Sequence, residues 1–476
     1  MINNFIKYMH GKVMSHRNGK RLWLQGTRPM QAGFAVGVKY DVIQKADSVE
    51  LRVNPNGKFT VSRKQVGDSY VPVMDVRLHV ESFGVGDRIR AVFYSGMVIV
   101  TIHHEQMAKM ERETRFINAI QAGATLKEGS LCSGGGISTA AIHDATTQAG
   151  VNARVVFVVD EAINYLQVAG VNNYAIDDQT QFFVSKLEEV PSQFIPKVDL
   201  LSFSLPCNGL SRSGSAKHKL SPEEHVSATS VFGLAQFIRA SNPSILVSEN
   251  VTEALDSPMY VLIKAEIARL GYRIIEDVTG NEKTGSLESR KRYWFVAVSD
   301  GLDAALEEGI FNYLLSRTHA SLNDIRDMSA DSDESNWCDN SYLKDKQIRD
   351  LAAKKGFAKR QLLNGKEENV GTIGKFYAKR RSTEPFWTRA DQKERLFSVK
   401  EHATVKQIPL CLVKGIPMTV AHEILGQSID FLQAFMPVHI LMRNAISIYR
   451  KGQCAIQIAS VHTFSNVARK LNYVAF

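Results

Sequence analysis

Cysteine is scarce in this sequence. Five cysteines are spread over 476 residues, and no two of them form a Cys-x-x-Cys pair. The spacing excludes the usual zinc-binding and redox motifs, so we expect no metal site and no disulfide framework. The five are Cys132, Cys207, Cys338, Cys411 and Cys454.

Long apolar runs are also missing. No stretch of about 18 uninterrupted apolar residues occurs, which argues against a transmembrane helix and a membrane partner. The first ten residues, MINNFIKYMH, lack a secretory cleavage pattern. We therefore expect a cytoplasmic protein.

Positive charge is concentrated in one segment. The chain has 58 Lys and Arg residues against 49 Asp and Glu, a net charge of +9, and residues 341–400 alone contain 16 against 7. Aromatic side chains lie among these cations, a mixture expected where a nucleic acid backbone is held and bases are stacked. A solvated basic surface is the alternative. The aromatic residues are Phe357, Phe376, Tyr377, Phe386 and Trp387.

Residues 1–115 alternate apolar and polar positions between short breaks, which predicts an all-β domain. An internal repeat is visible, because the segment 34–39 (FAVGVK) recurs 49 positions later as 83–88 (FGVGDR). The repeat weakly resembles the swapped-hairpin units of AbrB-like and SymE-like DNA-binding domains, duplicated within one chain. That resemblance implies an accessory DNA-binding domain, and a plain β-barrel is the alternative.

Residues 116–300 alternate continuous apolar runs with helical stretches. This pattern predicts an α/β fold with a doubly wound, mostly parallel sheet covered by helices on both faces. Ligands bind such sheets at the carboxyl ends of the strands. The apolar runs lie at 154–159, 198–205, 244–248 and 293–298.

Three chemical groups fall at the ends of these runs. Cys207 follows Pro206 where one run ends, Glu249 ends the next, and Arg290 and Arg292 precede the last. We therefore expect a nucleophilic thiol, an acid and a guanidinium at one edge of the sheet. Taken singly, a buried core thiol, a helix-capping carboxylate and exposed arginines at a strand start are the alternatives.

A glycine-rich turn precedes the first of these strands and opens a predicted helix. The amides around Ser133, Gly134 and Gly136 can bind an anionic group at a helix N-terminus, although a tight strand-to-helix connection also explains the glycines. Asp160 and Glu161 end the next strand, where an acid can accept hydrogen bonds from ribose hydroxyls. Together these residues predict a nucleoside-type cofactor.

The order of these motifs resembles that of the DNA cytosine-5 methyltransferases. The resemblance implies a Rossmann-like fold that binds S-adenosylmethionine and transfers its methyl group to carbon 5 of a flipped-out cytosine. The matching segments are Leu131 to Ile137, Asp160–Glu161, Leu205 to Ser211, Glu249 to Val251, Gly271–Tyr272, Glu288 to Arg292 and Gly426 to Ile429.

The resemblance also assigns roles to single residues. Cys207 would form the covalent adduct, Glu249 would act at ring N3, and Arg292, supported by Arg290, would offset the developing charge. The residues expected at the cofactor are Ser133, Gly134, Gly136, Asp160, Glu161, Pro206, Gln427 and Ser428.

The resemblance divides the rest of the chain as well. Residues 301–400 would be an inserted target-recognition region, and residues 401–476 a helical segment that completes the catalytic domain. The expected partner is double-stranded DNA, with a cognate restriction system as a candidate, a nucleoid location and a monomeric state. The predicted DNA-binding residues are Lys375, Lys379, Arg380 and Arg381.

Several positions depart from the family pattern. Leu205 replaces a proline, Glu288 a glutamine and Gln427 an asparagine, while Cys132 and Ile137 alter the glycine turn. Two other functions stay open from the sequence. One is an RNA cytosine-5 methyltransferase of the same fold, and the other is a non-catalytic DNA-binding regulator.

Overall fold

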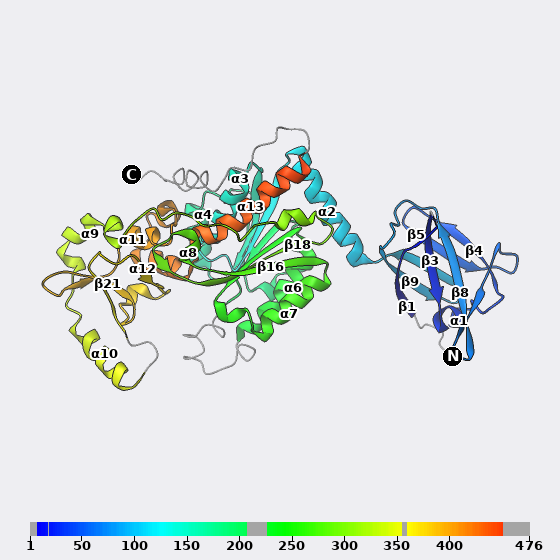
Figure 1. Cartoon of the computed structure of the whole chain (residues 1–476), viewed down its shortest axis with the longest axis horizontal. Helices are drawn as coiled ribbons and strands as arrows, with labels where there is room; N and C mark the ends of the chain where they lie inside the picture. Colours follow the sequence, from blue (N-terminus) through cyan, green and yellow to red (C-terminus); the bar gives the residue numbers. More distant parts are fainter. Residues whose placement is uncertain (1–6, 18, 207–225, 355–358, 451–476) are drawn as a thin grey trace. The chain divides into compact units, whose positions relative to one another are not determined.

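The computed structural model describes residues 7–17, 19–206, 226–354 and 359–450 (Figure 1). The chain forms two compact units, Met1–Glu111 and Arg112–Phe476. One helix, α2 (His104–Ala122), begins in the first unit and ends in the second. Each unit has its own apolar core, as expected of a domain.

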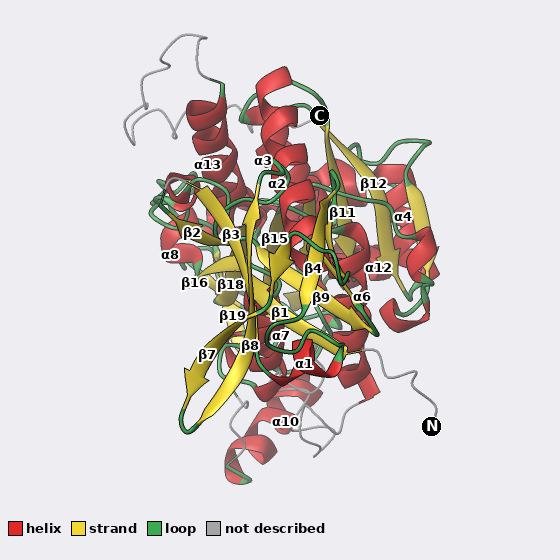
Figure 2. Ribbon diagram, turned by 90° about the vertical axis from the view of Figure 1, so that its right-hand side faces the viewer, coloured by secondary structure: helices red, strands yellow, loops and turns green. Residues whose placement is uncertain are grey.

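The first unit consists of two antiparallel sheets and a short helix (Figure 2). The strand orders are β1-β9-β10-β5-β4-β6 and β2-β3-β8-β7. Apolar residues from both sheets, such as Leu22, Leu51 and Phe93, form one buried core. The elements are β1 (Lys7–Lys12), β2 (Met14–His16), β3 (Gly19–Gln25), α1 (Thr27–Gln31), β4 (Lys39–Gln44), β5 (Ser48–Val53), β6 (Phe59–Thr60), β7 (Ser62–Val66), β8 (Ser69–Leu78), β9 (Arg88–Tyr94) and β10 (Met97–Ile102).

The internal repeat corresponds to two hairpins. The first is β4 with β5, and the second, 49 positions later, is β9 with β10. Gly37 and Gly86 precede the hairpins with φ angles of 86° and 93°, a conformation that favours glycine. The hairpins pair with each other through β5 and β10, where Leu51 faces Val98.

The two copies exchange their outer strands. β1 of the first copy pairs with β9 of the second, and β6 of the second pairs with β4 of the first. Val13 and Val61 make equivalent backbone hydrogen bonds to the turns at Gly86 and Gly37. Each copy therefore depends on the other for strand pairing. The likeness to AbrB-like or SymE-like units stays a prediction.

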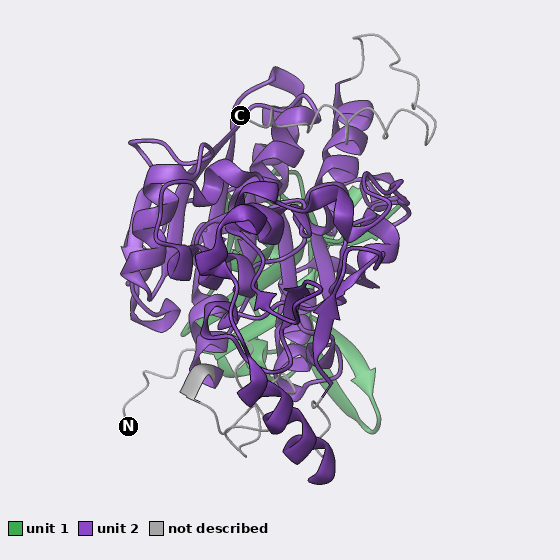
Figure 3. Ribbon diagram, turned by 90° about the vertical axis from the view of Figure 1, so that its left-hand side faces the viewer, with its two compact units in different colours: residues 1–111 green, residues 112–476 purple. Residues whose placement is uncertain are grey.

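The second unit, coloured purple in Figure 3, is built on a seven-stranded sheet with the order β13-β12-β11-β14-β15-β18-β16. The strands from β13 to β15 in this order are parallel, and β18 is antiparallel to both of its neighbours. This confirms the predicted doubly wound, mostly parallel α/β fold. The strands are β11 (Leu126–Leu131), β12 (Ala153–Asp160), β13 (Gln181–Val184), β14 (Leu200–Phe203), β15 (Ile245–Asn250), β16 (Tyr272–Thr279) and β18 (Arg292–Ser299).

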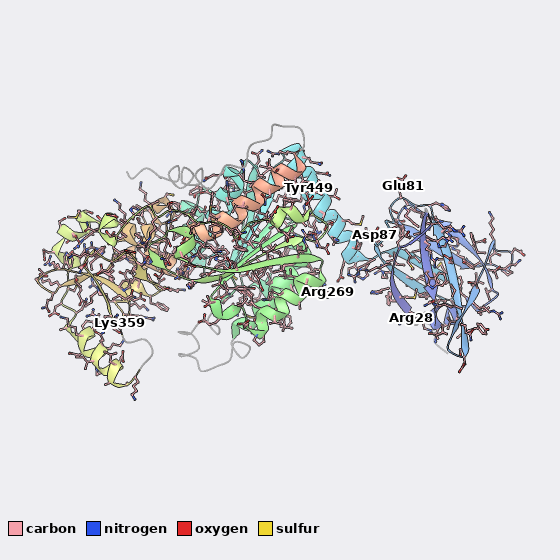
Figure 4. All side chains as sticks on the ribbon, in the orientation of Figure 1. Arg28, Glu81, Asp87, Arg269, Lys359 and Tyr449 are labelled. Carbon is pink, nitrogen blue, oxygen red and sulfur yellow. The ribbon has the colours of Figure 1, made fainter. Side chains whose placement is uncertain are left out.

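Helices cover both faces of this sheet. α3 (Ile137–Gln148) and α13 (Phe431–Tyr449) pack on one face, and α6 (Ser230–Ser241) and α7 (Pro258–Arg269) on the other. Figure 4 labels Tyr449 at the end of α13 and Arg269 at the end of α7. Successive side chains of a strand point to opposite faces of the sheet. Along β15, Ile245 and Val247 therefore pack on the side of α3 and α13, and Leu246 packs on the side of α6 and α7.

A region of short elements follows β18 and has an aromatic core of its own. Trp337, Tyr377 and Trp387 are buried there. The buried Arg395 donates to both carboxylate oxygens of Glu401 at 2.8 Å each, which ties this region to the returning helices. The elements are α9 (Met328–Ser332), α10 (Ser341–Ala352), β19 (Gln361–Leu363), β20 (Val370–Gly371), β21 (Pro385–Thr388), β22 (Glu394–Arg395), α11 (Val399–Thr404) and α12 (Met418–Gln427).

No single helix among the described residues has the length and apolar character needed to cross a membrane. The helices α12 and α13 reach the required length and apolar character only when they are counted together, and a bend of 50° separates them.

Two histidines are buried side by side where α11 meets α12. His402 Nδ1 and His422 Nδ1 lie 2.9 Å apart, so the N–H of one ring donates a hydrogen bond to the other ring. Tyr377 packs edge-on against both rings at centroid distances of 5.2 and 5.1 Å. Burial lowers the pKa of His422 to about 4 and also lowers that of His402. Both rings are therefore neutral at pH 7.

This pair predicts a loss of stability in mild acid. The unfolded histidines bind protons near pH 6.5 and the folded pair does not, so stability falls as the pH drops from 6.5 toward 4. At about 1.4 kcal/mol per pH unit, acidification from pH 7 to 5 costs about 2 kcal/mol for His422 alone. The double change His402→Phe/His422→Phe should flatten this dependence in denaturant titrations at pH 5, 6 and 7. The exposed control His79→Phe should leave the dependence unchanged, and an equal slope in both variants would contradict the assignment.

Candidate active site

The chemical groups predicted from the sequence gather at the carboxyl ends of the parallel strands. The strand order reverses between β11 and β14, and open α/β sheets bind ligands at such a switch point. The glycine turn follows β11 at this point, and Pro206 follows β14. Asp160 is the last residue of β12 and Glu249 the penultimate residue of β15, so all four segments lie at the carboxyl-terminal edge of the sheet.

Asp160 fastens the glycine turn. Its Oδ2 accepts a hydrogen bond from the amide of Gly134 at 2.8 Å, and its Oδ1 accepts one from the amide of Ala162 at 2.9 Å. Gly134 and Gly136 have φ angles of 52° and 79°, which glycine adopts without strain. Glu161, the next residue, is exposed and makes no hydrogen bond within the described residues. Glu161 is therefore the acid at this strand end that is open to a ligand.

The glycine turn is packed closely from behind. A Cβ on Gly135 would lie 2.5 Å from Ile424 of α12. Asn173 donates to the carbonyl of Gly136 at 2.8 Å. Ser133 belongs to the same turn, and its amide donates to the carbonyl of Val159 at 3.1 Å. These contacts give the turn one fixed shape.

Cys132 lies at the start of the turn but is not a candidate nucleophile. Burial raises the pKa of its thiol well above the ordinary value, and the neighbouring Asp160 adds to this effect. A thiol in this state stays protonated at neutral pH, and the thiolate is the reactive form.

Gln427 and Ser428 come from the far end of the chain and meet the glycine turn. A Cβ on Gly134 would lie 3.2 Å from Gln427 Nε2, so the amide group of Gln427 is beside the turn. The hydroxyl of Ser428 donates to the carbonyl of Leu425 at 2.8 Å and ends α12. The structure therefore brings the two ends of the predicted cofactor site together.

Glu249 and Arg292 form an ion pair at the same edge. Arg292 Nε lies 2.9 Å from Glu249 Oε1, and the two side chains are only 14% and 12% exposed. The pairing of β15 with β18 sets this contact, because it places the end of one strand beside the start of the other. The guanidinium thus fixes the direction of the carboxyl group.

Asn250 lies in the segment Glu249 to Val251, and the family resemblance assigned it no role. Its Nδ2 donates to the carbonyl of Leu205 at 2.9 Å and to the hydroxyl of Tyr260 at 2.8 Å. The first bond fixes the backbone at the point where the chain leaves β14 toward Pro206. Cys207 itself lies outside the described residues, and Asn250 holds the described backbone two residues before it.

Glu288, Arg290 and Lys406 form a buried charged cluster behind this edge. Glu288 Oε1 accepts from the amide of Ile373 at 2.6 Å, and Glu288 Oε2 lies 3.3 Å from Lys406 Nζ. Arg290 lies 3.6 Å from Glu288 and reaches the carbonyl of Gly426 at 3.5 Å. Burial, reinforced by the positive charge of Arg290, lowers the pKa of Lys406 to about 7. Arg290 is thus a buried supporting residue, whereas Arg292 faces the edge.

Lys406 was missed in the sequence because nothing near it marks a site. The only available signal was Glu288, which stands where the resemblance expects a neutral glutamine. A buried carboxylate needs a compensating charge, and Lys406 supplies it from 118 positions further along the chain.

A protein-family model described as C-5 cytosine-specific DNA methylase matches residues 127–428. The chain belongs to this family. The matched segment runs from the strand before the glycine turn to Ser428, so this C-5 cytosine methylase carries its N-terminal unit outside the family region. Comparison with curated protein sequences gives no significant match.

Solved structures agree with the methylase on the fold. The Entamoeba histolytica methyltransferase EhMeth is 17% identical, with a TM-score of 0.53 over 68% of this chain and 98% of its own. Schizosaccharomyces pombe (S. pombe) Dnmt2 methyltransferase is 16% identical, with a TM-score of 0.51 over 67% and 98%. A variant of Spodoptera frugiperda DNMT2 is 19% identical, with a TM-score of 0.50 over 66% and 99%. At these identities the likeness shows the methyltransferase fold alone.

The basic residues predicted to bind DNA do not share one environment in this methylase. Lys379 and Arg381 are exposed, and their charges lie 4.9 and 4.5 Å from the ring centroid of Phe376. Arg380, between them, is half-buried and donates to the carbonyl of Asn336 at 3.4 Å.

Lys375 points in another direction. Its ammonium group lies 5.0 Å above the ring of Tyr165 in α4 (Ile163–Asn172), next to the glycine turn. Lys379 and Arg381 are therefore the two predicted residues that remain available at the surface of the inserted region.

The close approach of Gly426 to Gly374 predicts a strong steric effect. A Cβ on Gly426 would lie 2.2 Å from the carbonyl oxygen of Gly374, and backbone atoms on both sides limit any adjustment. Gly426→Ala should therefore lower the free energy of unfolding by about 2 kcal/mol or more, although alanine is the better helix former. Denaturant titration measures this change. The control Gly11→Ala, whose Cβ would meet Ile89 at an ordinary 3.5 Å, should be close to neutral, and equal stability of both variants would refute the contact.

Proposed function

We propose that this chain is a DNA cytosine-5 methyltransferase that uses S-adenosylmethionine and a covalent adduct of Cys207. The observation that carries the proposal is the Glu249–Arg292 pair at the strand-end edge, beside the loop that leads to Cys207. Membership of the C-5 cytosine methylase family supports the reaction type.

The residues of the edge divide the chemistry between them. Carbon 5 of cytosine is a weak nucleophile, so the thiolate of Cys207 first adds to carbon 6 and makes carbon 5 electron-rich. Glu249 holds a proton or hydrogen bond at ring N3, and Arg292 stabilises the negative charge that develops near O2. The ion pair keeps both groups oriented before the base arrives, which lowers the cost of assembling the site.

The second half of the reaction restores the ring. S-adenosylmethionine, when bound, supplies an electrophilic methyl group. After carbon 5 has taken that group, the proton on carbon 5 leaves to a base and the sulfur of Cys207 departs from carbon 6. The Asn250 contact to Leu205 supports this step, because it fixes the backbone two residues before the thiol.

The described residues fit a nucleoside cofactor at the switch point. The turn at Gly134 and Gly136 presents backbone without side chains, and the N-terminus of α3 favours a carboxylate. Glu161 is the exposed acid for ribose hydroxyls, since both oxygens of Asp160 are used by backbone amides. We propose that Ser133, Gln427, Ser428 and Pro206 complete this site.

The choice of DNA rests on the inserted region and on charge. We propose that residues 301–400 form the target-recognition region, with 116–300 and 401–476 as the catalytic domain around it. Lys379 and Arg381 would contact phosphates of the duplex from which the cytosine is rotated at a cost of a few kcal/mol. Protection of DNA against a cognate restriction enzyme, by a monomeric protein, is the role we propose for the activity.

Methyl transfer tests the proposal directly. With labelled S-adenosylmethionine and mixed-sequence duplex DNA, the wild-type chain should label cytosine at carbon 5. Cys207→Ser should lose transfer by at least about 10³-fold while still binding DNA, because oxygen is a poor substitute for the thiolate. The control Cys411→Ser changes an exposed cysteine and should transfer at the wild-type rate.

Three outcomes would reject the proposal. Transfer by Cys207→Ser at the wild-type rate would remove the covalent step. Transfer to structured RNA but not to any DNA duplex would make the chain an RNA methyltransferase, and transfer to neither would favour a non-catalytic regulator. Bisulfite sequencing of DNA from cells that express the chain reads activity and target site together.

Asn250 provides a second test with a matched control. Asn250→Ala removes the bond to the Leu205 carbonyl, and a displaced loop should lower kcat by about 10² with little change in cofactor affinity. Tyr260→Phe removes only the other partner of the same amide and should lower kcat by less than about threefold. Equal losses in the two variants would show that Asn250 acts through packing and not through the loop.

A further inference from the structure

The outer face of the four-stranded sheet in the N-terminal unit has an unusual composition. Along β3, Leu22 and Leu24 are fully buried, so the alternate residues Arg21, Trp23 and Gln25 lie on the opposite face. Across the strands, Arg21 is paired with Arg77 and Trp23 with Asp75. Lys64 of β7 belongs to the same face, because it pairs with Val71, four residues before Asp75 in β8. β8 lies between β7 and β3, and Figure 2 labels all three strands. We call Arg21, Trp23, Lys64 and Arg77 the basic face.

The side chains of the basic face are held in place. The guanidinium of Arg21 lies 4.4 Å and the ammonium of Lys64 6.0 Å from the ring centroid of Trp23. Gln25 Oε1 accepts from Trp23 Nε1 at 2.8 Å and from Lys64 Nζ at 3.3 Å. Two cations, on strands separated by β8, are thus fixed around one ring, which lowers the entropy cost of binding an anion.

Cations outnumber acids in this sheet. The four strands of the sheet contain five Lys and Arg residues and one acid, Asp75, which lies 3.6 Å from Arg21 and 3.9 Å from Arg77. Residues 1–111 contain 16 Lys and Arg against 9 Asp and Glu, so this unit has a net charge of +7 of its own. Partial desolvation, followed by the charges of Arg77, Arg21 and Arg17, lowers the pKa of His16 beside the face. The excess charge favours a polyanion as the partner.

We propose that the basic face binds the phosphate backbone of duplex DNA. Neighbouring strands are about 4.8 Å apart, so the cations from β7 to β3 span about 10 Å, a distance that matches several phosphates. Among the described residues of this face Trp23 is the one large aromatic ring, and Arg21 already covers it. A row of open rings, which successive unpaired bases would need, is therefore missing, and the observations favour a duplex over a single strand.

This proposal goes beyond the methyl transfer reaction. The basic face lies in the unit outside the family region, and it requires no residue of the strand-end edge. Its role is to raise the affinity for DNA without reading sequence, because contacts to phosphates position a protein on the duplex but carry no base information.

Charge reversal in the full-length chain tests the basic face. The triple variant Arg21→Glu/Lys64→Glu/Arg77→Glu should bind a labelled 30-base-pair duplex at least about tenfold more weakly. Its plot of log affinity against log salt should lose about two to three from the slope, since each released phosphate contact accounts for about 0.9. The control Lys12→Glu/Lys39→Glu/Lys58→Glu makes the same charge change at exposed residues outside this sheet. The control should keep a slope within about one of the wild type.

The readouts separate this proposal from the proposed function. Methyl transfer at saturating DNA should be unchanged in the triple variant, and a wild-type chain without transfer activity leaves the binding test intact. If charge reversal impairs folding, the neutral variant Arg21→Gln/Lys64→Gln/Arg77→Gln should show the same loss at about half the size. Equal effects of the triple variant and its control, or loss of affinity for an RNA hairpin alone, would overturn the proposal.

Discussion

A single buried carboxylate, that of Glu288, links the three parts of the catalytic unit. It accepts from the backbone of Ile373 in the inserted region, faces Lys406 beyond α11, and lies near Arg290 at the start of β18. Breaking a buried charged pair by removing one partner costs about 3–5 kcal/mol, so Lys406 and Arg290 cannot move away without leaving a charge unmatched. Moving Ile373 away would leave a buried carboxylate oxygen without its hydrogen bond. Arg292 lies two residues after Arg290, so the cluster also limits where Arg292 can lie.

The second constraint is that successive side chains of the seven-stranded sheet point to its two opposite faces. Apolar side chains cover both of its faces, so helices pack on both sides and only the strand ends are open to a ligand. The antiparallel β18 matters at this point, because it brings Arg292 to the same edge as the end of β15. A parallel strand there would have placed Arg292 at the opposite edge from Glu249.

Most strands of the catalytic unit could be predicted from the sequence, whereas the contacts between residues far apart in the chain could not. The apolar runs at 154–159, 244–248 and 293–298 match β12, β15 and β18 within two residues, since buried strands give a local signal. β16 was missed because its residues are mostly half-buried and show no clear run. Two contacts join segments that are far apart in the sequence: Asn250 with Leu205, 45 positions away, and Glu288 with Lys406, 118 positions away. No local sequence pattern predicts such pairs. The glycine turn was found, but the use of both Asp160 oxygens by backbone amides could be learned only from three dimensions.

The exchanged strands of the N-terminal unit have a consequence for its assembly. A single repeat on its own would leave the edges of two hairpin strands unpaired, and in this chain the second copy covers them. Because both copies lie in one polypeptide, each strand finds its partner within the same molecule, and the pairing does not depend on protein concentration. Covalent linkage also allows the two copies to differ, as the segments FAVGVK and FGVGDR do. Two linked copies can thus carry different surface side chains while each still completes the other's sheet.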